Sequence, residues 1–218
     1  MNARMDNSIQ ELLNTYTSLK VNEETSEEAV LLGSIRVHRS MGQFVLNKHY
    51  EIEIHIPKQE GMLPYVVDTG KAINIKYPHI YPDRKLCLAT DIDMQVSFSK
   101  DPSLIRWMED FVEAYFVSYE YYERYGVFPM GERPHGATGI IQSYTEIFDV
   151  NVIQAAEIVL FISYKTYRGH QPCPCGSGNR IRKCHGKKIL GFYNNPVLLE
   201  QVRTDCKLIC NDLCQEVN

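Results

Sequence analysis

KYPHIYPDRKLCL, residues 76–88, is the stretch from which the fold and the chemistry of this chain are inferred. Pro78 and Pro82 fix their own φ angles and push the residues before them toward extended geometry, so the stretch is predicted to be a stiff, irregular loop. Cys87 is the only cysteine before residue 173. A lone cysteine is commonly a small buried hydrophobe, but a stiff loop can also hold it in place as a nucleophile.

Two neighbours favour chemistry at Cys87. Arg84 and Lys85 lie just upstream, and nearby positive charge stabilises the thiolate, which is the nucleophilic form. His79 lies eight residues upstream and can reach the same site. Its ring can donate an N–H to a developing oxyanion, as an amide does, and can also carry a proton.

A helix and a series of strands are predicted before this loop. Ser8 and Glu11 can form a capping box at the start of an amphipathic helix, and the acidic run 23–28 is expected to be a solvated connection. Apolar and polar residues alternate through residues 50–56, which is typical of a strand with one buried face, and Pro57 ends it. Further extended segments are expected at residues 35–37, 63–67 and 73–75.

Helices are predicted after the loop. Asp101 is a candidate N-cap for a long helix that reaches Tyr125 and ends at Gly126. The tyrosines near the end of this helix are assigned to core packing, with a stacking surface as the alternative. Two more helices are expected over residues 140–148 and over residues 152–167, the latter ended by Gly169.

The spacing of residues 76–88 resembles the active-site segment of ubiquitin-conjugating enzymes. In that family a His-Pro-Asn triplet precedes the catalytic Cys-Leu. Aligned on Cys87, the triplet falls on Tyr77-Pro78-His79, so His79 takes the place of the asparagine that steadies the oxyanion, and two of the three residues differ. The resemblance spans about residues 8–165. It implies an α+β fold of the UBC-like type, with a four-stranded antiparallel meander and helices, in a domain of residues 1–168.

GERPHGATG, residues 131–139, is a glycine-rich loop between the predicted helices. It can be a tight connection with a surface histidine, or it can place His135 and Glu132 at the rim of the Cys87 site. A similar Gly-His loop occurs in bacterial ubiquitin-conjugating-like proteins, and this likeness keeps the second interpretation open.

A second motif, CPCGSGNRIRKCHG at residues 173–186, pairs three cysteines with one histidine. Tetrahedral zinc takes four such ligands, and here they are Cys173, Cys175, Cys184 and His185. Four protein ligands leave no open position for water, so the zinc is predicted to be structural. The motif resembles the SEC-C motif at the tail of the preprotein translocase motor SecA, and residues 169–218 are expected to form a small zinc-binding module with a C-terminal helix.

Charged and thiol side chains surround this motif. Five basic residues can compensate the thiolates or meet an acidic or phosphate-bearing partner, and we favour compensation; they are Arg180, Arg182, Lys183, Lys187 and Lys188. In the last helix, which starts at Asn195 and Pro196, Cys206, Cys210 and Cys214 recur every four residues. They are interpreted as buried thiols rather than as a second metal or redox cluster, because no histidine or carboxylate completes such a set.

Composition limits the partners and the compartment. The chain has 218 residues, 44% of them hydrophobic, and a formal net charge of −4, so neither nucleic acid nor a membrane is expected as the main partner. No apolar run approaches eighteen residues and the first ten residues are polar, which predicts a cytoplasmic protein. Its cysteines are then thiols and metal ligands rather than disulfides.

The combination of motifs resembles bacterial conjugating proteins of CBASS anti-phage operons, which act beside a cGAS-like nucleotidyltransferase. The resemblance implies that Cys87 forms a thioester with the C-terminus of that partner and passes it to an amine, with His79 as oxyanion donor or proton carrier. His135 and Glu132 would orient or deprotonate the amine. The alternatives are a non-catalytic UBC-like module that docks a partner through the zinc knuckle, and a nucleic-acid or ribosome adaptor. A homodimer is an open possibility.

Overall fold

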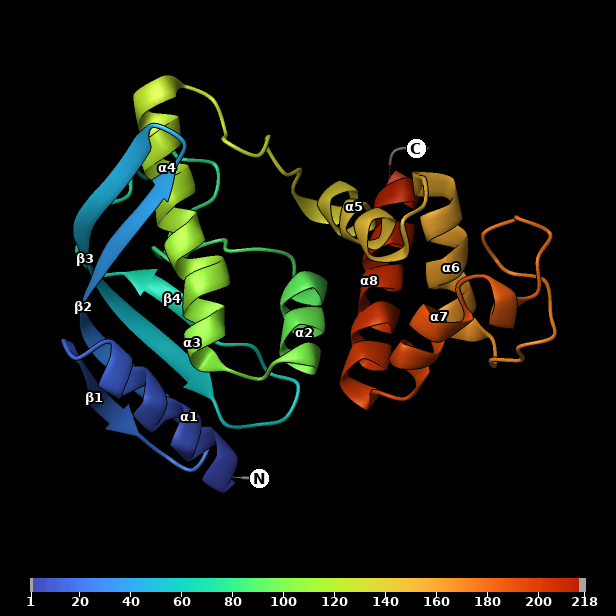
Figure 1. Cartoon of the computed structure of the whole chain (residues 1–218), viewed down its shortest axis with the longest axis horizontal. Coiled ribbons are helices and arrows are strands. Elements are labelled where there is room, and N and C mark those ends of the chain that lie inside the picture. Colours follow the sequence, from blue (N-terminus) through green and yellow to red (C-terminus); the bar gives the residue numbers. More distant parts are fainter. Residues whose placement is uncertain (1, 216–218) are drawn as a thin grey trace. The chain divides into compact units, whose positions relative to one another are not determined.

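The computed structural model describes the backbone of residues 2–215 and the side chains of residues 6–212. Its contacts divide the chain into two compact units (Figure 1). The first unit holds the residues up to 89 together with 97–132, and the second holds 90–96 together with the residues from 133 onward. The chain is of the expected α+β class.

A four-stranded antiparallel meander forms the centre of the first unit, as predicted. The strand order follows the sequence: β1 (Leu19–Glu24), β2 (Glu28–Met41), β3 (Phe44–Pro57) and β4 (Tyr65–Asp68). Along β3 the even-numbered residues from Tyr50 to Ile56 are buried, because alternate side chains of a strand point to the same face. Pro57 ends β3 as expected.

The composition of the meander differs from the prediction at two places. Residues 19–24 form the edge strand β1, so most of the acidic run belongs to a strand and to a short turn rather than to a long connection. All residues of β1 after Leu19 are exposed, which removes the alternation that would have revealed it. Residues 73–75 are not a strand, because the backbone N–H of Ile73 donates to the Asp68 carboxylate at 2.9 Å.

Two helical segments complete the first unit. The first is α1 (Asn2–Thr15), and the second runs without interruption through α3 (Leu104–Trp107), a π-helical turn (Met108–Glu113) and α4 (Ala114–Tyr125). Ser103, not Asp101, is the N-cap of α3, since its hydroxyl accepts the Arg106 N–H. The predicted capping box of α1 is wrong: α1 starts well before Ser8, whose hydroxyl accepts the Leu104 N–H at 3.4 Å. Gly126 ends α4 in the left-handed region, as predicted.

The second unit is helical. Its elements are the first six residues of α2 (Asp91–Lys100), α5 (Gly136–Phe148), α6 (Val152–Tyr164), a 3-10 turn (Ile181–Lys183), α7 (Gly186–Tyr193) and α8 (Pro196–Gln215). Helices α2 and α7 were not expected, and α6 ends at Tyr164, before Gly169. Cys173 and Cys175 belong to the same core as α5, α6 and α8. The boundary predicted between residues 168 and 169 therefore falls inside this unit, and that division into domains stays a prediction.

Among the described residues, no single helix combines the length and apolar character needed to span a membrane. Helices α5 and α6 meet that test only as a pair, with a bend of 88° at the break between them.

Candidate functional site

The Cys87 loop is fixed to the sheet through its backbone. The Leu86 N–H donates to the Val66 carbonyl at 2.9 Å, and the Asp68 N–H donates to the Arg84 carbonyl at 3.0 Å. The next amide, that of Cys87, donates to the His79 carbonyl at 2.9 Å. The loop is therefore irregular but held at both ends, as the two prolines predicted.

A tight turn at Tyr81–Lys85 connects these two ends. Its backbone is closed by the Arg84 N–H, which donates to Tyr81 at 2.9 Å, and Arg84 itself adopts a φ of 72°. The left-handed conformation is uncommon for a residue with a side chain, and contacts of the Arg84 guanidinium help to hold it. The guanidinium pairs with the fully buried Asp68 carboxylate and also donates to the Ile73 carbonyl at 2.7 Å.

These contacts bear on the prediction that Arg84 and Lys85 stabilise a thiolate at Cys87. The Arg84 guanidinium is engaged by Asp68, and the Lys85 ammonium lies 4.3 Å from the centre of the Tyr65 ring. Both cations are thus engaged by groups other than the Cys87 thiol. A direct ion pair of either cation with a Cys87 thiolate stays a prediction.

His79 is the neighbour that the fold does bring to Cys87. A ring nitrogen of His79 lies within 4.8 Å of the Cys87 sulfur, and both side chains are half-buried. The His79 ring meets Tyr77 and Phe128 edge to face, with centroid distances of 5.5 and 5.3 Å. Aromatic packing of this kind restricts the orientation of the ring. At this separation one water can bridge the imidazole and the thiol for proton exchange.

The tyrosines of α4 form the base on which this loop lies. Tyr77 packs edge to face on Tyr115 and Tyr119, with centroid distances of 5.9 and 5.0 Å, and Tyr122 adds a tilted contact. Burial raises the pKa of Tyr77 to about 12 and also raises the pKa of Tyr115, so both hydroxyls stay protonated. Core packing, rather than a stacking surface, is the use the fold makes of these tyrosines. Sequence reasoning did not assign them to the site, although their four-residue spacing could have suggested a shared face.

Glu132 and His135 fall in different units. Glu132 is exposed at the end of the first unit, and His135 is the exposed N-cap residue of α5 in the second. The His135 side chain makes no capping hydrogen bond. The roles predicted for both residues at Cys87 stay predictions.

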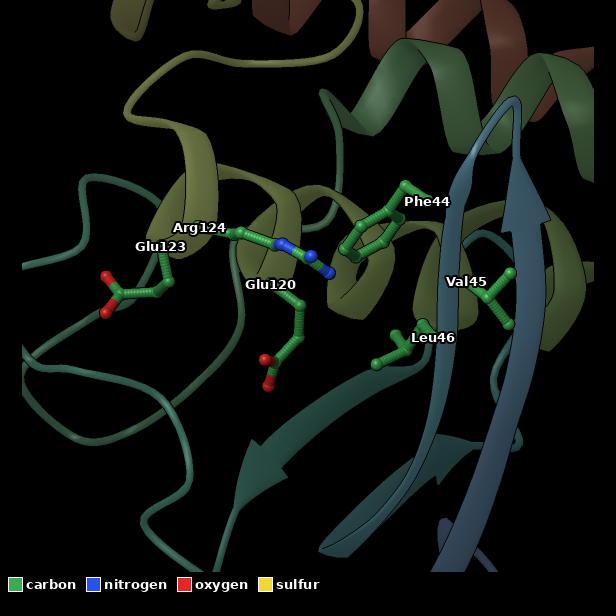
Figure 2. A pocket seen from close by; sticks show the side chains of 6 residues that line it. All are labelled: Phe44, Val45, Leu46, Glu120, Glu123 and Arg124. Atoms are coloured by element: carbon green, nitrogen blue, oxygen red, sulfur yellow. The ribbon is translucent and has the colours of Figure 1, made fainter.

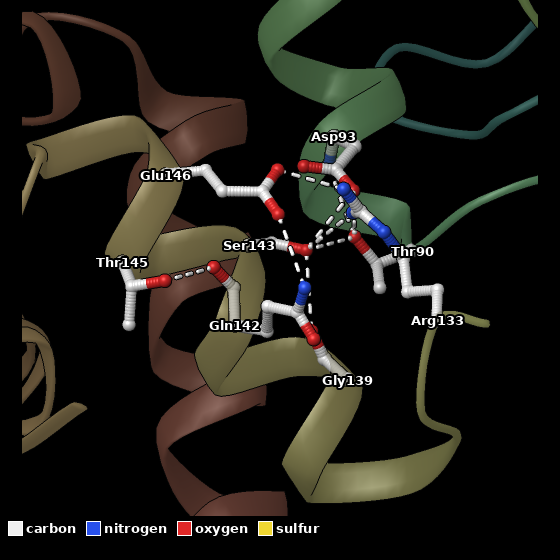
Figure 3. A network of polar contacts seen from close by, with 8 residues as sticks. All are labelled: Thr90, Asp93, Arg133, Gly139, Gln142, Ser143, Thr145 and Glu146. Carbon is white, nitrogen blue, oxygen red and sulfur yellow. Dashed lines mark hydrogen bonds and ion pairs between the residues drawn. The ribbon is translucent and has the colours of Figure 1, made fainter. Parts of the chain in front are cut away.

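The glycine-rich loop is tied to the second unit through Arg133 (Figure 3). The guanidinium pairs with Asp93 of α2 and donates to Glu146 of α5 at 2.7 Å. The buried Ser143 hydroxyl donates to the same Asp93 carboxylate at 2.9 Å, and Thr90 does so at 2.8 Å. A side chain at Gly139 would collide with the Pro134 carbonyl, at 1.9 Å from an added Cβ, so this glycine permits the turn into α5.

Cys173, Cys175, Cys184 and His185 form the predicted cluster and can hold a metal such as zinc. The Cys175 and Cys184 sulfurs lie 3.6 Å apart, and His185 Nδ1 lies 3.3 Å from the sulfurs of both Cys173 and Cys184. Ligands at the Zn–S and Zn–N bond lengths of a tetrahedral site would be separated by about 3.5–3.8 Å. The donor atoms are therefore close to the positions that one tetrahedral cation requires.

Two thiols of this cluster differ in acidity. Burial raises the pKa of Cys173 to about 11. Burial opposes ionisation of Cys175 too, yet hydrogen bonds from Ser177 and from the neighbouring thiols lower its pKa to about 6. Metal binding requires all three cysteines as thiolates, so it would release the proton that the buried Cys173 retains.

The basic residues around the cluster and the thiols of α8 were also predicted. Arg180, Arg182, Lys183, Lys187 and Lys188 are all exposed. Cys206 is buried and Cys210 is half-buried, as expected for thiols that pack in a core, while the side chain of Cys214 lies outside the described residues.

The first unit also has an open pocket of about 320 Å³ between the β2–β3 hairpin and α4 (Figure 2). Phe44, Val45 and Leu46 form its apolar side, and its polar side is formed by Glu120, Glu123 and Arg124. Glu120 is already held by Lys48 at 2.6 Å and by the Tyr50 hydroxyl at 2.8 Å. None of the six lining residues is a predicted site residue.

Comparison with models of known protein families, with curated proteins and with solved structures finds no match to this chain.

Proposed function

We propose that this chain is a cysteine acyltransferase that works like a ubiquitin-conjugating enzyme. The single observation that carries the proposal is the pairing of Cys87 with His79 on a loop clamped to the edge of a meander sheet. The order of helix, meander, cysteine loop and helices supports a UBC-like fold for this chain. Its resemblance to conjugating proteins of CBASS operons supports a cGAS-like nucleotidyltransferase as the protein whose C-terminus is transferred.

The reaction has two acyl-transfer steps. The Cys87 thiolate attacks the carbonyl carbon of the partner's C-terminal acyl group, a C–S bond forms, and the group previously bonded to that carbon leaves with a proton. An amine then attacks the thioester, an amide forms, and the thiolate leaves. His79 is placed to donate an N–H to the oxyanion or to accept the proton of the thiol.

The acyl group that Cys87 attacks can be supplied in two ways. An adenylated carboxyl requires ATP and a separate activating enzyme, since the sequence contains no glycine-rich phosphate loop after a strand. Attack on an existing peptide bond near the partner's C-terminus requires neither, and the leaving group is then the released peptide amine.

The Cys3His cluster supports a structural zinc ion rather than a catalytic one. All four positions of a tetrahedral site would be filled by protein ligands, and Cys173 and Cys175 are part of a helical core. A zinc ion bound there would cross-link the chain between residues 173 and 185. Its resemblance to SEC-C motifs supports a docking role for this module.

A non-catalytic function is the second candidate. The engagement of Arg84 by Asp68 and of Lys85 by Tyr65 favours it, because neither cation is then dedicated to activating the thiol. In this case the first unit binds the nucleotidyltransferase without forming a covalent bond.

Intact mass of the chain co-expressed with its neighbouring nucleotidyltransferase distinguishes the two. The transferase should carry an adduct that disappears on treatment with thiol reductant, and Cys87→Ala should abolish it. Cys210→Ala is the matched control, since it removes a half-buried thiol from α8. An adduct of equal amount in the Cys87→Ala variant would exclude the catalytic function.

A further inference from the structure

The His79 carbonyl accepts two hydrogen bonds. One comes from the Cys87 amide at 2.9 Å, and the other comes from the Tyr115 hydroxyl, also at 2.9 Å. Tyr115 is 5% exposed and lies on α4, so the bond joins a buried helix residue to the loop. One carbonyl oxygen thereby connects the backbone of both candidate reacting residues to a helix.

Tyr119 lies one helical turn further along the same face and serves a different segment. It is also 5% exposed. Its hydroxyl accepts the Asn74 N–H at 3.0 Å and donates to the Ala72 carbonyl at 3.3 Å. Two equally buried tyrosines thus hold two different parts of the chain, and only Tyr115 reaches the Cys87–His79 pair.

We propose that Tyr115 is a positioning residue, whose hydroxyl bond to the His79 carbonyl fixes the separation between the Cys87 thiol and the His79 ring. The Cys87 amide and the rings of Tyr77 and Phe128 also restrict His79, and the Tyr115 hydroxyl adds a bond from a different element. Removing the hydroxyl leaves that carbonyl with one donor, and the aromatic packing of Tyr115 is retained. The effect should therefore fall on the geometry of the pair and not on the core.

The protonation state of Tyr115 agrees with this role. Burial raises its pKa, and the charges of Tyr77 and of a Cys87 thiolate raise it further. The hydroxyl therefore remains a donor throughout the pH range in which the thiol ionises. A negative charge on the Cys87 sulfur raises the Tyr115 pKa, so the two groups are close enough to interact electrostatically.

Tyr115→Phe and Tyr119→Phe in the full chain form a matched pair of variants. Hydrogen exchange, resolved to single amides by NMR, should show about a five- to tenfold loss of protection at the Cys87 amide in Tyr115→Phe, which corresponds to the net value of one hydrogen bond. In Tyr119→Phe the loss should fall on the Asn74 amide instead. Loss of equal size at both amides in both variants would mean general loosening and would overturn the proposal.

A second measurement asks whether the chemistry of the pair changes. The rate at which iodoacetamide alkylates Cys87 is followed by peptide mass against pH. The midpoint of that profile should shift in Tyr115→Phe and stay at the wild-type value in Tyr119→Phe, because only the first changes the distance from sulfur to imidazole. An unshifted midpoint in Tyr115→Phe would reduce Tyr115 to a packing residue.

The consequence for acyl transfer rests on the proposed function: Tyr115→Phe should slow adduct formation about five- to tenfold. The exchange and alkylation measurements need neither the partner nor an adduct. Absence of a wild-type adduct would therefore refute the transferase and leave the positioning result standing, while unchanged exchange would refute the positioning with the adduct intact.

Discussion

Cys87 and the Cys173–His185 cluster place cysteines in opposite circumstances. The Cys87 loop is held by main-chain hydrogen bonds to β4 and to His79. In the cluster the sulfurs themselves are the connection, with donor atoms 3.3–3.6 Å apart and two of the three cysteines buried. The backbone positions the Cys87 loop, whereas in the cluster the side chains themselves meet.

Removing a ligand from the cluster should have the largest effect on stability. Structural zinc supplies on the order of 10 kcal/mol of folding free energy in small zinc-binding peptides. We therefore expect Cys184→Ser to lower the free energy of unfolding by more than about 5 kcal/mol and to release the metal. Urea denaturation with metal analysis of the purified protein tests this. Cys210→Ser should retain the metal, and full stability of Cys184→Ser would show that no metal supports this region.

The sequence predicted the cluster better than the rest of its unit. Cysteine and histidine spacing alone specifies which four side chains meet, because few other arrangements satisfy the ligands of one cation. Helices α2 and α7 were missed because they have only 10 and 8 residues, too few for a repeated apolar pattern to be recognised. The grouping of α5 and α6 with residues 173–215 depends on long-range packing that no local pattern encodes.

The Cys87 loop was predictable for a different reason. Pro78 and Pro82 restrict the backbone wherever they occur, so a stiff loop follows from the sequence. The partners of Arg84 did not follow, because Asp68 lies sixteen residues away and becomes a partner only when the turn approaches β4. The role of the Tyr115 hydroxyl was missed for the same reason, because its acceptor, the His79 carbonyl, is distant in the sequence.

The second largest effect is expected at Asp68, which supports the Cys87 loop. Asp68 is fully buried, pairs with Arg84 and accepts the backbone N–H groups of Ala72 and Ile73. Asp68→Ala leaves the guanidinium without its carboxylate, which should cost about 3–5 kcal/mol in the free energy of unfolding.

Asp83→Ala is the control for this prediction. Asp83 is exposed in the same turn and accepts only the Lys85 N–H, at 3.1 Å, among its assigned bonds. The expected loss there is about 1 kcal/mol. Equal losses in denaturant unfolding for the two variants would show that the turn, and not the buried ion pair, stabilises the loop.

Asp205 gives the second unit a pH dependence of about 2–3 kcal/mol. Burial raises its pKa from 3.8 to about 6, against the lowering effect of hydrogen bonds from Tyr144 at 2.7 Å and Gln201 at 2.9 Å. Both of these donors to Asp205 are neutral, whereas Asp68 is paired with the cationic Arg84. Since the folded pKa is higher than the unfolded one, the folded state binds more protons between pH 4 and 6.

Stability should therefore fall as the pH rises through this interval and level off above about pH 6. Chemical denaturation of the wild type at several pH values measures the slope, and Asp205→Asn should remove the part that Asp205 contributes. A slope that is unchanged in Asp205→Asn would assign the dependence to other carboxylates.

The smallest effect on stability is expected for Cys87→Ala. The side chain is small and only half-buried, so the free energy of unfolding should change by about 1 kcal/mol or less. The same truncation at Cys173, which is buried in the cluster, should cost several times more and release the metal. Because both variants carry the same Cys→Ala substitution, their denaturant unfolding and metal content compare the two sites directly. If Cys87→Ala proves as costly as Cys173→Ala, its sulfur has a structural role after all, and the distinction between a reactive thiol and a supporting one no longer holds.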